Sequence, residues 1–132
     1  MNKFLILLTT LTLSTALAHT AVSSITPSLN AVVAAPRAVQ LKFSEPVEVR
    51  FSTFRVMAVP AGQTIQAAAQ LALAEKADSD RLASLPLTAT TTAAQLNIPL
   101  KARLRSGQYV IAWKILSEDG HPVTGQSTFR VK

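Results

Sequence analysis

The sequence predicts an all-β domain, built as a small antiparallel β-sandwich. Two observations support this prediction. Apolar and polar residues alternate in several short runs, and turns containing proline or glycine separate these runs. One alanine-rich segment departs from the pattern and predicts a short helical connection around residues 64–77.

The first eighteen residues are predicted to be a signal peptide. Lys3 supplies a positive start, an uncharged apolar run follows, and Ala16–Ala18 has the small-x-small pattern of a cleavage site. The alternative is a membrane anchor, but the run contains threonines and is shorter than the roughly 20 apolar residues that a span needs. We therefore expect cleavage after Ala18, export to the periplasm, and one soluble domain over residues 19–132.

Short alternating runs define the expected strands. In the first of them, Val39, Leu41 and Phe43 share one face. The predicted strands are residues 38–44, 47–59, 94–100, 108–116 and 126–132. Their number and spacing are typical of a Greek-key sandwich or barrel, immunoglobulin-like or cupredoxin-like in type.

Two of these runs have particular features. The alternation in residues 47–59 changes phase, which predicts a bulge or bend near Ser52 and Thr53. Residues 108–116 are apolar on both faces, which predicts a central strand with Tyr109 and Trp113 in the core.

The connection over residues 63–86 is rich in alanine, glutamine and leucine and has no β-branched residue after Ile65, so it favours a helix. Asp78, Ser79 and Asp80 follow the helical stretch. Their spacing is too sparse for a calcium loop, so we interpret them as capping or turn residues.

Charge and composition exclude several classes of function. The formal charge of +6 falls to +5 when Lys3 leaves with the signal, and Lys101, Arg103 and Arg105 would share one face of a strand. A solvated face, or one near anionic headgroups, explains them better than a nucleic-acid partner, because aromatic residues are few. The chain has no cysteine, no G-x-S-x-G elbow and no glycine-rich phosphate loop.

His19 becomes chemically distinctive if it is the first residue of the mature chain. Its free α-amine and its Nδ1 can then close a six-membered chelate ring on a metal ion, which an internal histidine cannot do because its backbone nitrogen is an amide. The amine, with an ordinary pKa of about 7.7–8.0, must lose its proton to bind. Cu(II) competes well for such nitrogens and favours tetragonal sites of nitrogen and oxygen.

Asp119 and His121 can complete such a site. At positions i and i+2 they can point the same way from extended or turn backbone, and Pro122 favours extended geometry at His121. The set would supply three nitrogens and one oxygen. Two alternatives remain open, since Asp119 with Gly120 forms a good turn by itself and His121 could be a surface residue.

Three segments of the chain resemble those of one protein family. They are "AHTAVSSITPSLNAVVAAP", "LKFSEPVE" and "SGQYVIAWKILSEDGHPVTGQSTFRV", in this order. The sequence is similar there to the copper-resistance C family, the small exported CopC-like copper-binding sandwiches, over the whole mature chain except residues 63–86. The resemblance implies that His19, Asp119 and His121 bind one Cu(II) per chain, with Glu45 held beside the metal.

The resemblance also implies a function in copper homeostasis or resistance. The protein would be a monomer without catalytic activity that sequesters copper or delivers it, with an inner-membrane CopD-like permease as a possible partner. Some family members have a methionine-rich Cu(I) site, but the mature chain here has only Met57, so none is expected. The alternatives are a copper mono-oxygenase with a histidine brace and a metal-free immunoglobulin-like interaction domain.

Overall fold

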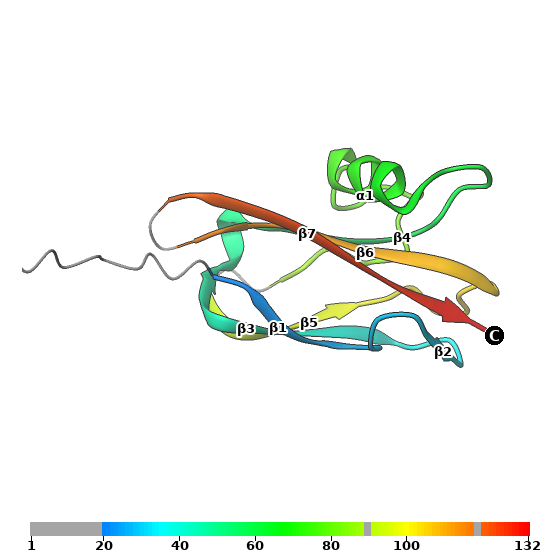
Figure 1. Ribbon diagram of the computed structural model, residues 1–132, viewed down its shortest axis with the longest axis horizontal. Coiled ribbons are helices and arrows are strands. Elements are labelled where there is room, and N and C mark those ends of the chain that lie inside the picture. The colour runs from blue at the N-terminus through cyan, green and yellow to red at the C-terminus, as the bar shows by residue number, and fades with distance from the viewer. Residues whose placement is uncertain (1–19, 89–90, 118–119) are drawn as a thin grey trace, which may run out of the picture.

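Two β-sheets form the layers of the protein, and one helix lies outside them (Figure 1). The computed structural model describes residues 20–88, 91–117 and 120–132. One sheet has the order β1–β3–β5, and the other has the order β2–β7–β6–β4. The predicted sandwich is therefore confirmed.

The three-stranded sheet is antiparallel throughout, with β3 in the centre. Its strands are β1 (Val22–Thr26), β3 (Ala38–Glu48) and β5 (Thr92–Pro99). In the second sheet β6 pairs antiparallel with both neighbours, whereas the short β2 runs parallel to β7. The strands of this sheet are β2 (Ala31–Val33), β4 (Thr53–Ala58), β6 (Gly107–Leu116) and β7 (Pro122–Val131).

The prediction of one bent strand over residues 47–59 is wrong in its topology. Val47 and Glu48 end β3, a single 3-10 turn (η1, Val49–Phe51) follows, and β4 begins at Thr53. Because β3 and β4 belong to different sheets, the change of phase marks the crossing between layers and not a bulge within one strand.

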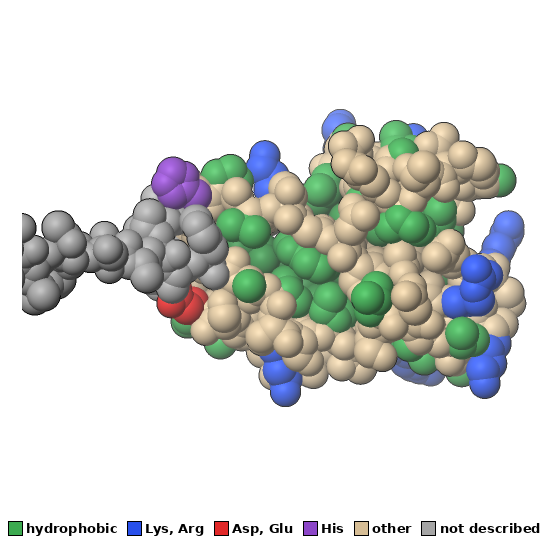
Figure 2. Space-filling model, viewed as in Figure 1, with side chains coloured by type: hydrophobic (Ala, Val, Ile, Leu, Met, Phe, Trp, Pro, Cys, Tyr) green, Lys and Arg blue, Asp and Glu red, His purple; other side chains and the backbone are tan. Residues whose placement is uncertain are grey.

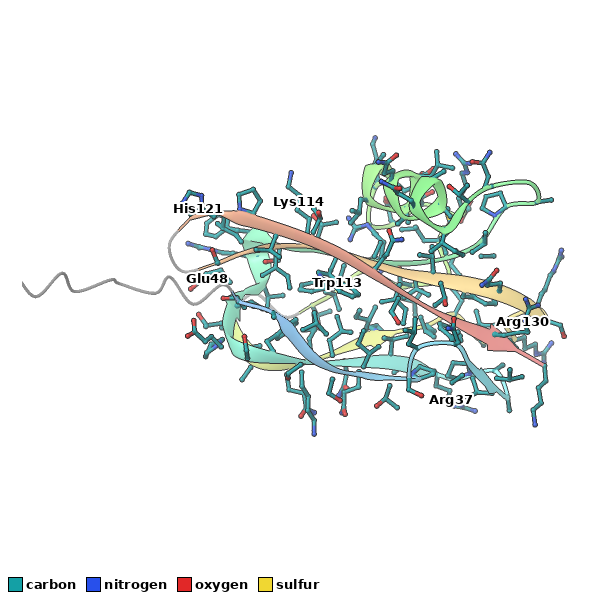
Figure 3. All side chains as sticks on the ribbon, viewed as in Figure 1. Arg37, Glu48, Trp113, Lys114, His121 and Arg130 are labelled. Carbon is teal, nitrogen blue, oxygen red and sulfur yellow. The ribbon has the colours of Figure 1, made fainter. Side chains whose placement is uncertain are left out.

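The core lies between the two sheets. Tyr109, Ile111 and Trp113 point into it from β6, and Phe129 stacks on Tyr109 with ring centroids 5.3 Å apart. Trp113 lies between the layers (Figure 3). The sequence-based placement of Tyr109 and Trp113 in the core is confirmed, since both are almost fully buried.

A second apolar layer explains why β6 is apolar on both faces. Helix α1 (Ile65–Ala74) lies on the outer side of the four-stranded sheet and buries Ala68, Ala69 and Ala72 there. These small side chains pack with Met57, Val110 and Ala112. Burial of both faces accounts for the central position of the strand, as predicted.

The helix begins close to its predicted start and ends before its predicted end. The hydroxyl of Thr64 caps the first turn by accepting the amide of Ala67 at 3.1 Å. Glu75 is already extended, and its carboxylate accepts hydrogen bonds from Ser79 and Arg81 in the turn that follows. The interpretation of residues 78–80 as turn residues agrees with this arrangement.

Among the described residues, no helix is long and apolar enough to cross a membrane.

Lys101, Arg103 and Arg105 do not lie on a strand, which corrects the prediction that they share a strand face. They occupy the connection between β5 and β6, where Arg103 has a left-handed backbone with a φ of 59°. A left-handed residue cannot continue a β-strand, so the alternation of charge there does not reflect a pleated sheet.

Gly125 allows β7 to lie close to the indole of Trp113, its partner across the ladder. A Cβ on Gly125 would lie 2.5 Å from Cε2 of Trp113, which is too close for two carbon atoms. The ring therefore occupies the space that a side chain at residue 125 would need.

We expect Gly125→Ala to lower the free energy of unfolding by about 1–3 kcal/mol, because the indole must move within a packed core. Thermal unfolding followed by tryptophan fluorescence measures the effect. Thr124→Ala, on the neighbouring exposed position, is the control and should change stability far less. Equal stability of the two variants would contradict the close packing of Trp113 on residue 125.

Candidate metal centre

Two of the four predicted site residues lie within the described chain. His121 immediately precedes β7, and Glu45 lies near the end of β3. His19 and Asp119 lie outside the described residues. The site is therefore described through His121, Glu45 and the backbone next to positions 19 and 119.

The turn between β6 and β7 fixes the backbone at His121. Ser117 donates twice to the carbonyl oxygen of His121, from its amide at 3.2 Å and from its hydroxyl at 2.8 Å. The amide of Gly120 donates to the carbonyl of Ser117 at 2.9 Å, and Leu116 pairs with Pro122 at the end of the ladder. The side chain of His121 is exposed at the tip of the molecule (Figure 3).

The start of β1 is held beside Glu45. Ala21 and Ser44 exchange two hydrogen bonds: the amide of Ala21 donates to the Ser44 hydroxyl at 2.9 Å, and the amide of Ser44 donates to the carbonyl of Ala21 at 2.8 Å. Thr20 is almost fully buried. The first described residues are thus fixed next to the half-buried Glu45, which follows Ser44 in sequence.

The hydroxyl of Ser52 joins the two sheets at this end. Ser52 Oγ accepts the amide of Leu116 at 3.1 Å and donates to the carbonyl of Glu48 at 2.8 Å. Leu116 ends β6 and Glu48 ends β3. The β6–β7 turn is therefore linked to the strand that holds Glu45, and Figure 3 shows His121 and Glu48 at the same end of the molecule.

The two glutamates at this end differ in their contacts. Glu48 Oε1 accepts a hydrogen bond of 2.9 Å from the hydroxyl of Thr92. In the parts of the chain that the structure describes, the one ion pair joins Arg81 to Glu75, so Glu45 has no cationic partner there. Figure 2 shows acidic and histidine side chains at this end, whereas lysine and arginine gather most clearly at the opposite end.

The described residues do not form a complete metal site by themselves. Residues 20–88, 91–117 and 120–132 contain no group of three or more His, Asp, Glu or Cys side chains placed to hold a metal. The turn presents one imidazole, and Thr20 and Gly120, which adjoin positions 19 and 119 in the sequence, are described. Nitrogen and oxygen donors of this kind suit Cu(II), so the residues present fit the predicted ion.

Met57 is buried beneath α1, where its thioether packs with Ala68 and Val110. Its role in the described chain is to fill the contact between helix and sheet.

The structure also reveals positioning residues that the sequence interpretation missed. Three serine hydroxyls bind backbone groups at the end of the molecule that carries His121. They belong to Ser44, Ser52 and Ser117. Ser44 and Ser117 lie within the segments "LKFSEPVE" and "SEDGHPVTG", and a serine before a turn commonly binds backbone nearby. The cross-sheet role of Ser52 has no such local signal, because it depends on the crossing of the chain between layers.

Comparison with known proteins agrees with this architecture. The family model described as CopC domain matches residues 22–132. The chain is 34% identical to Protein YobA of Escherichia coli K12, over 96% of this chain and 90% of that protein. It is 33% identical to copper resistance protein C of Pseudomonas syringae pv. tomato, over 87% of this chain and 82% of that protein.

Solved structures show the same fold. PcoC, a methionine-rich copper resistance protein from Escherichia coli, superposes with a TM-score of 0.60 at 29% identity, covering 87% of this chain and all of PcoC. CopC from Methylosinus trichosporium OB3b superposes with a TM-score of 0.58 at 24% identity, covering 86% and 94% of the two chains. Sequence and fold together show that the chain belongs to the CopC family.

Proposed function

We propose that this protein binds one Cu(II) ion in the periplasm, and that its ligands are the α-amine and ring of His19, the carboxylate of Asp119 and the ring of His121. The observation that carries the proposal is the junction at one end of the sandwich. There Ser44 holds the start of β1 beside Glu45, and Ser52 links that strand to the turn that presents His121.

The chemistry of this ligand set favours Cu(II). An amine and two imidazoles are nitrogen donors of intermediate softness, and a carboxylate completes a tetragonal set. Cleavage after Ala18 creates the amine, so the chelate ring at His19 forms only in the mature chain. Glu45 would accept a hydrogen bond from the amine or an imidazole and so orient the donor.

Such a protein sequesters or delivers copper and does not catalyse a reaction. Two copper resistance proteins C, from Escherichia coli and Pseudomonas syringae, are among its relatives, which supports a function in copper resistance. We propose that the protein works as a monomer, with a membrane copper permease as the recipient of the ion.

The first experiment tests the amine directly. We compare the chain that starts at His19 with the same chain carrying one alanine before His19. The extension converts the amine into an amide, so we expect it to lower Cu(II) affinity by more than the roughly 10–100-fold typical of losing an outer hydrogen-bond partner. Competition with a chromophoric Cu(II) chelator measures the affinity, and EPR reports the change in nitrogen ligation.

Equal Cu(II) affinity in both forms would refute the role of the amine. Equal thermal stability of the two apo forms serves as the control. Copper-dependent, ascorbate-driven oxidation of a polysaccharide by the chain starting at His19 would instead favour the mono-oxygenase.

A second experiment tests Glu45. We expect Glu45→Gln to lower Cu(II) affinity by about tenfold, because the amide orients the ligand donors less well than a carboxylate. Glu48→Gln is the matched control: Glu48 lies three residues further along, and its side chain already binds Thr92. The Cu(II) affinity of Glu48→Gln should remain close to that of the unmodified protein. A larger loss in Glu48→Gln than in Glu45→Gln would contradict the assignment of Glu45.

A further inference from the structure

Basic residues gather at the end of the sandwich opposite His121. This basic end includes Arg37, Lys101, Arg103, Arg105, Arg130 and Lys132, which come from three separate parts of the chain. Figure 3 shows Arg37 and Arg130 at this end and His121 and Glu48 at the other, and Figure 2 shows lysine and arginine side chains clustered there. The charge of the protein is therefore distributed unevenly along its long axis.

Hydrogen bonds and a shared hollow bring these segments together. The amide of Leu100 donates to the carbonyl of Arg37 at 2.9 Å, and a hollow of about 460 Å³ is lined by Arg37, Lys101 and Arg103, among others. The connection after β5 is joined to the residue that follows β7, because the hydroxyl of Ser106 donates to the carbonyl oxygen of Lys132 at 2.6 Å. The basic end is thus a single surface.

These cations have no carboxylate partner in the described segments. The ion pair found there joins Arg81 to Glu75, and Lys101 Nζ donates at 3.2 Å to the backbone carbonyl of Asp80, not to its carboxylate. Arg37, Arg103, Arg105 and Arg130 are all exposed. Arg103 occupies a left-handed turn position that glycine or asparagine adopts more readily, and it places a cation at the tip of the connection.

An exposed aliphatic side chain adjoins the cations. Val32 is 56% exposed. Val32 lies on the edge strand β2 directly beside Arg130, its partner in the parallel pairing with β7. Unpaired cations next to protruding aliphatic groups are the combination that binds an anionic membrane surface, where headgroups attract the charge and the interface accepts the apolar groups.

We propose that the basic end docks on a bilayer that contains anionic phospholipid. An acidic protein partner would also attract the cations, but it gives no reason for Val32 to protrude beside Arg130. A bilayer needs no shape complementarity and accommodates cations spread over three segments. The inference takes from the proposed function only the export of the protein, and it does not depend on copper.

Docking through this end leaves His121 and Glu45 pointing away from the bilayer. The two ends are separated by the length of β6 and β7, which at about 3.3 Å per residue is roughly three Debye lengths or more at physiological ionic strength. Copper binding and docking should therefore be independent of one another.

The test is co-sedimentation of residues 19–132 with vesicles of phosphatidylglycerol and phosphatidylcholine, compared with vesicles of phosphatidylcholine alone. We expect binding only to the anionic vesicles, weakening as salt rises. The variant Arg37→Gln/Arg103→Gln/Arg130→Gln should bind on the order of 100-fold less, at roughly fivefold for each cation removed. The matched variant Lys42→Gln/Lys76→Gln/Lys114→Gln loses the same charge elsewhere and should retain most of the binding.

Two further measurements test the apolar contribution to vesicle binding and the independence of docking from copper binding. Val32→Ser should weaken vesicle binding, whereas Phe51→Ser, which removes a larger exposed apolar group in η1, should not. Cu(II) affinity of the basic-end variant should equal that of the unmodified chain, so a failure of docking is distinguishable from a failure of the copper site. Circular dichroism confirms that each variant is folded.

Three results would overturn the proposal. The first is absence of binding to anionic vesicles at physiological salt. The second is equal loss in the two triple variants, which would show that net charge and not the basic end determines binding. The third is binding to immobilised poly-glutamate without binding to vesicles, which would indicate an acidic polypeptide as the partner.

Discussion

The long pairing of β6 with β7 is the constraint on which the rest of the structure depends. Ten residue pairs run from Gly107 with Val131 to Leu116 with Pro122. Because the register is unbroken, it places Trp113 against Gly125 in the core and closes the turn that carries His121. A slip of β7 by one residue against β6 would turn the core side chains of β7 outward, so packing in the centre fixes the geometry at both ends.

The two ends of this hairpin have different chemistry. One end presents the imidazole of His121. The Ser52 hydroxyl links the end of β6 there to the carbonyl of Glu48, at the end of the strand that holds Glu45. The other end presents Arg105 and Arg130 beside the connection after β5. The proposed copper site and the proposed docking surface thus lie at opposite ends of the β6–β7 pair, and the apolar core lies between them.

Much of the fold could be predicted from residue patterns, and the failures have physical reasons. Alternation indicated the sandwich, and the doubly apolar run at 108–116 indicated a central strand, which the structure places beneath α1. Alternation could not show that the change of phase after Glu48 is a crossing between sheets, since a bulge produces the same local pattern. It also missed β1 and β2, because β2 has only three residues and β1 has no fully buried one. For the proposed site, residue types and spacing indicated His121, and the family resemblance indicated Glu45. The role of Ser52 arises only from tertiary structure.

The location of the copper ion is the central claim, and paramagnetic broadening tests it most directly. Cu(II) is added in less than stoichiometric amount to ¹⁵N-labelled residues 19–132, and amide signals near the ion lose intensity. The predicted result is selective loss at Ala21, Ser44, Ser117 and Gly120, with Arg103 and Arg130 unaffected. Broadening centred on the basic end or on α1, or spread evenly over the chain, would contradict a copper site at the β6–β7 turn.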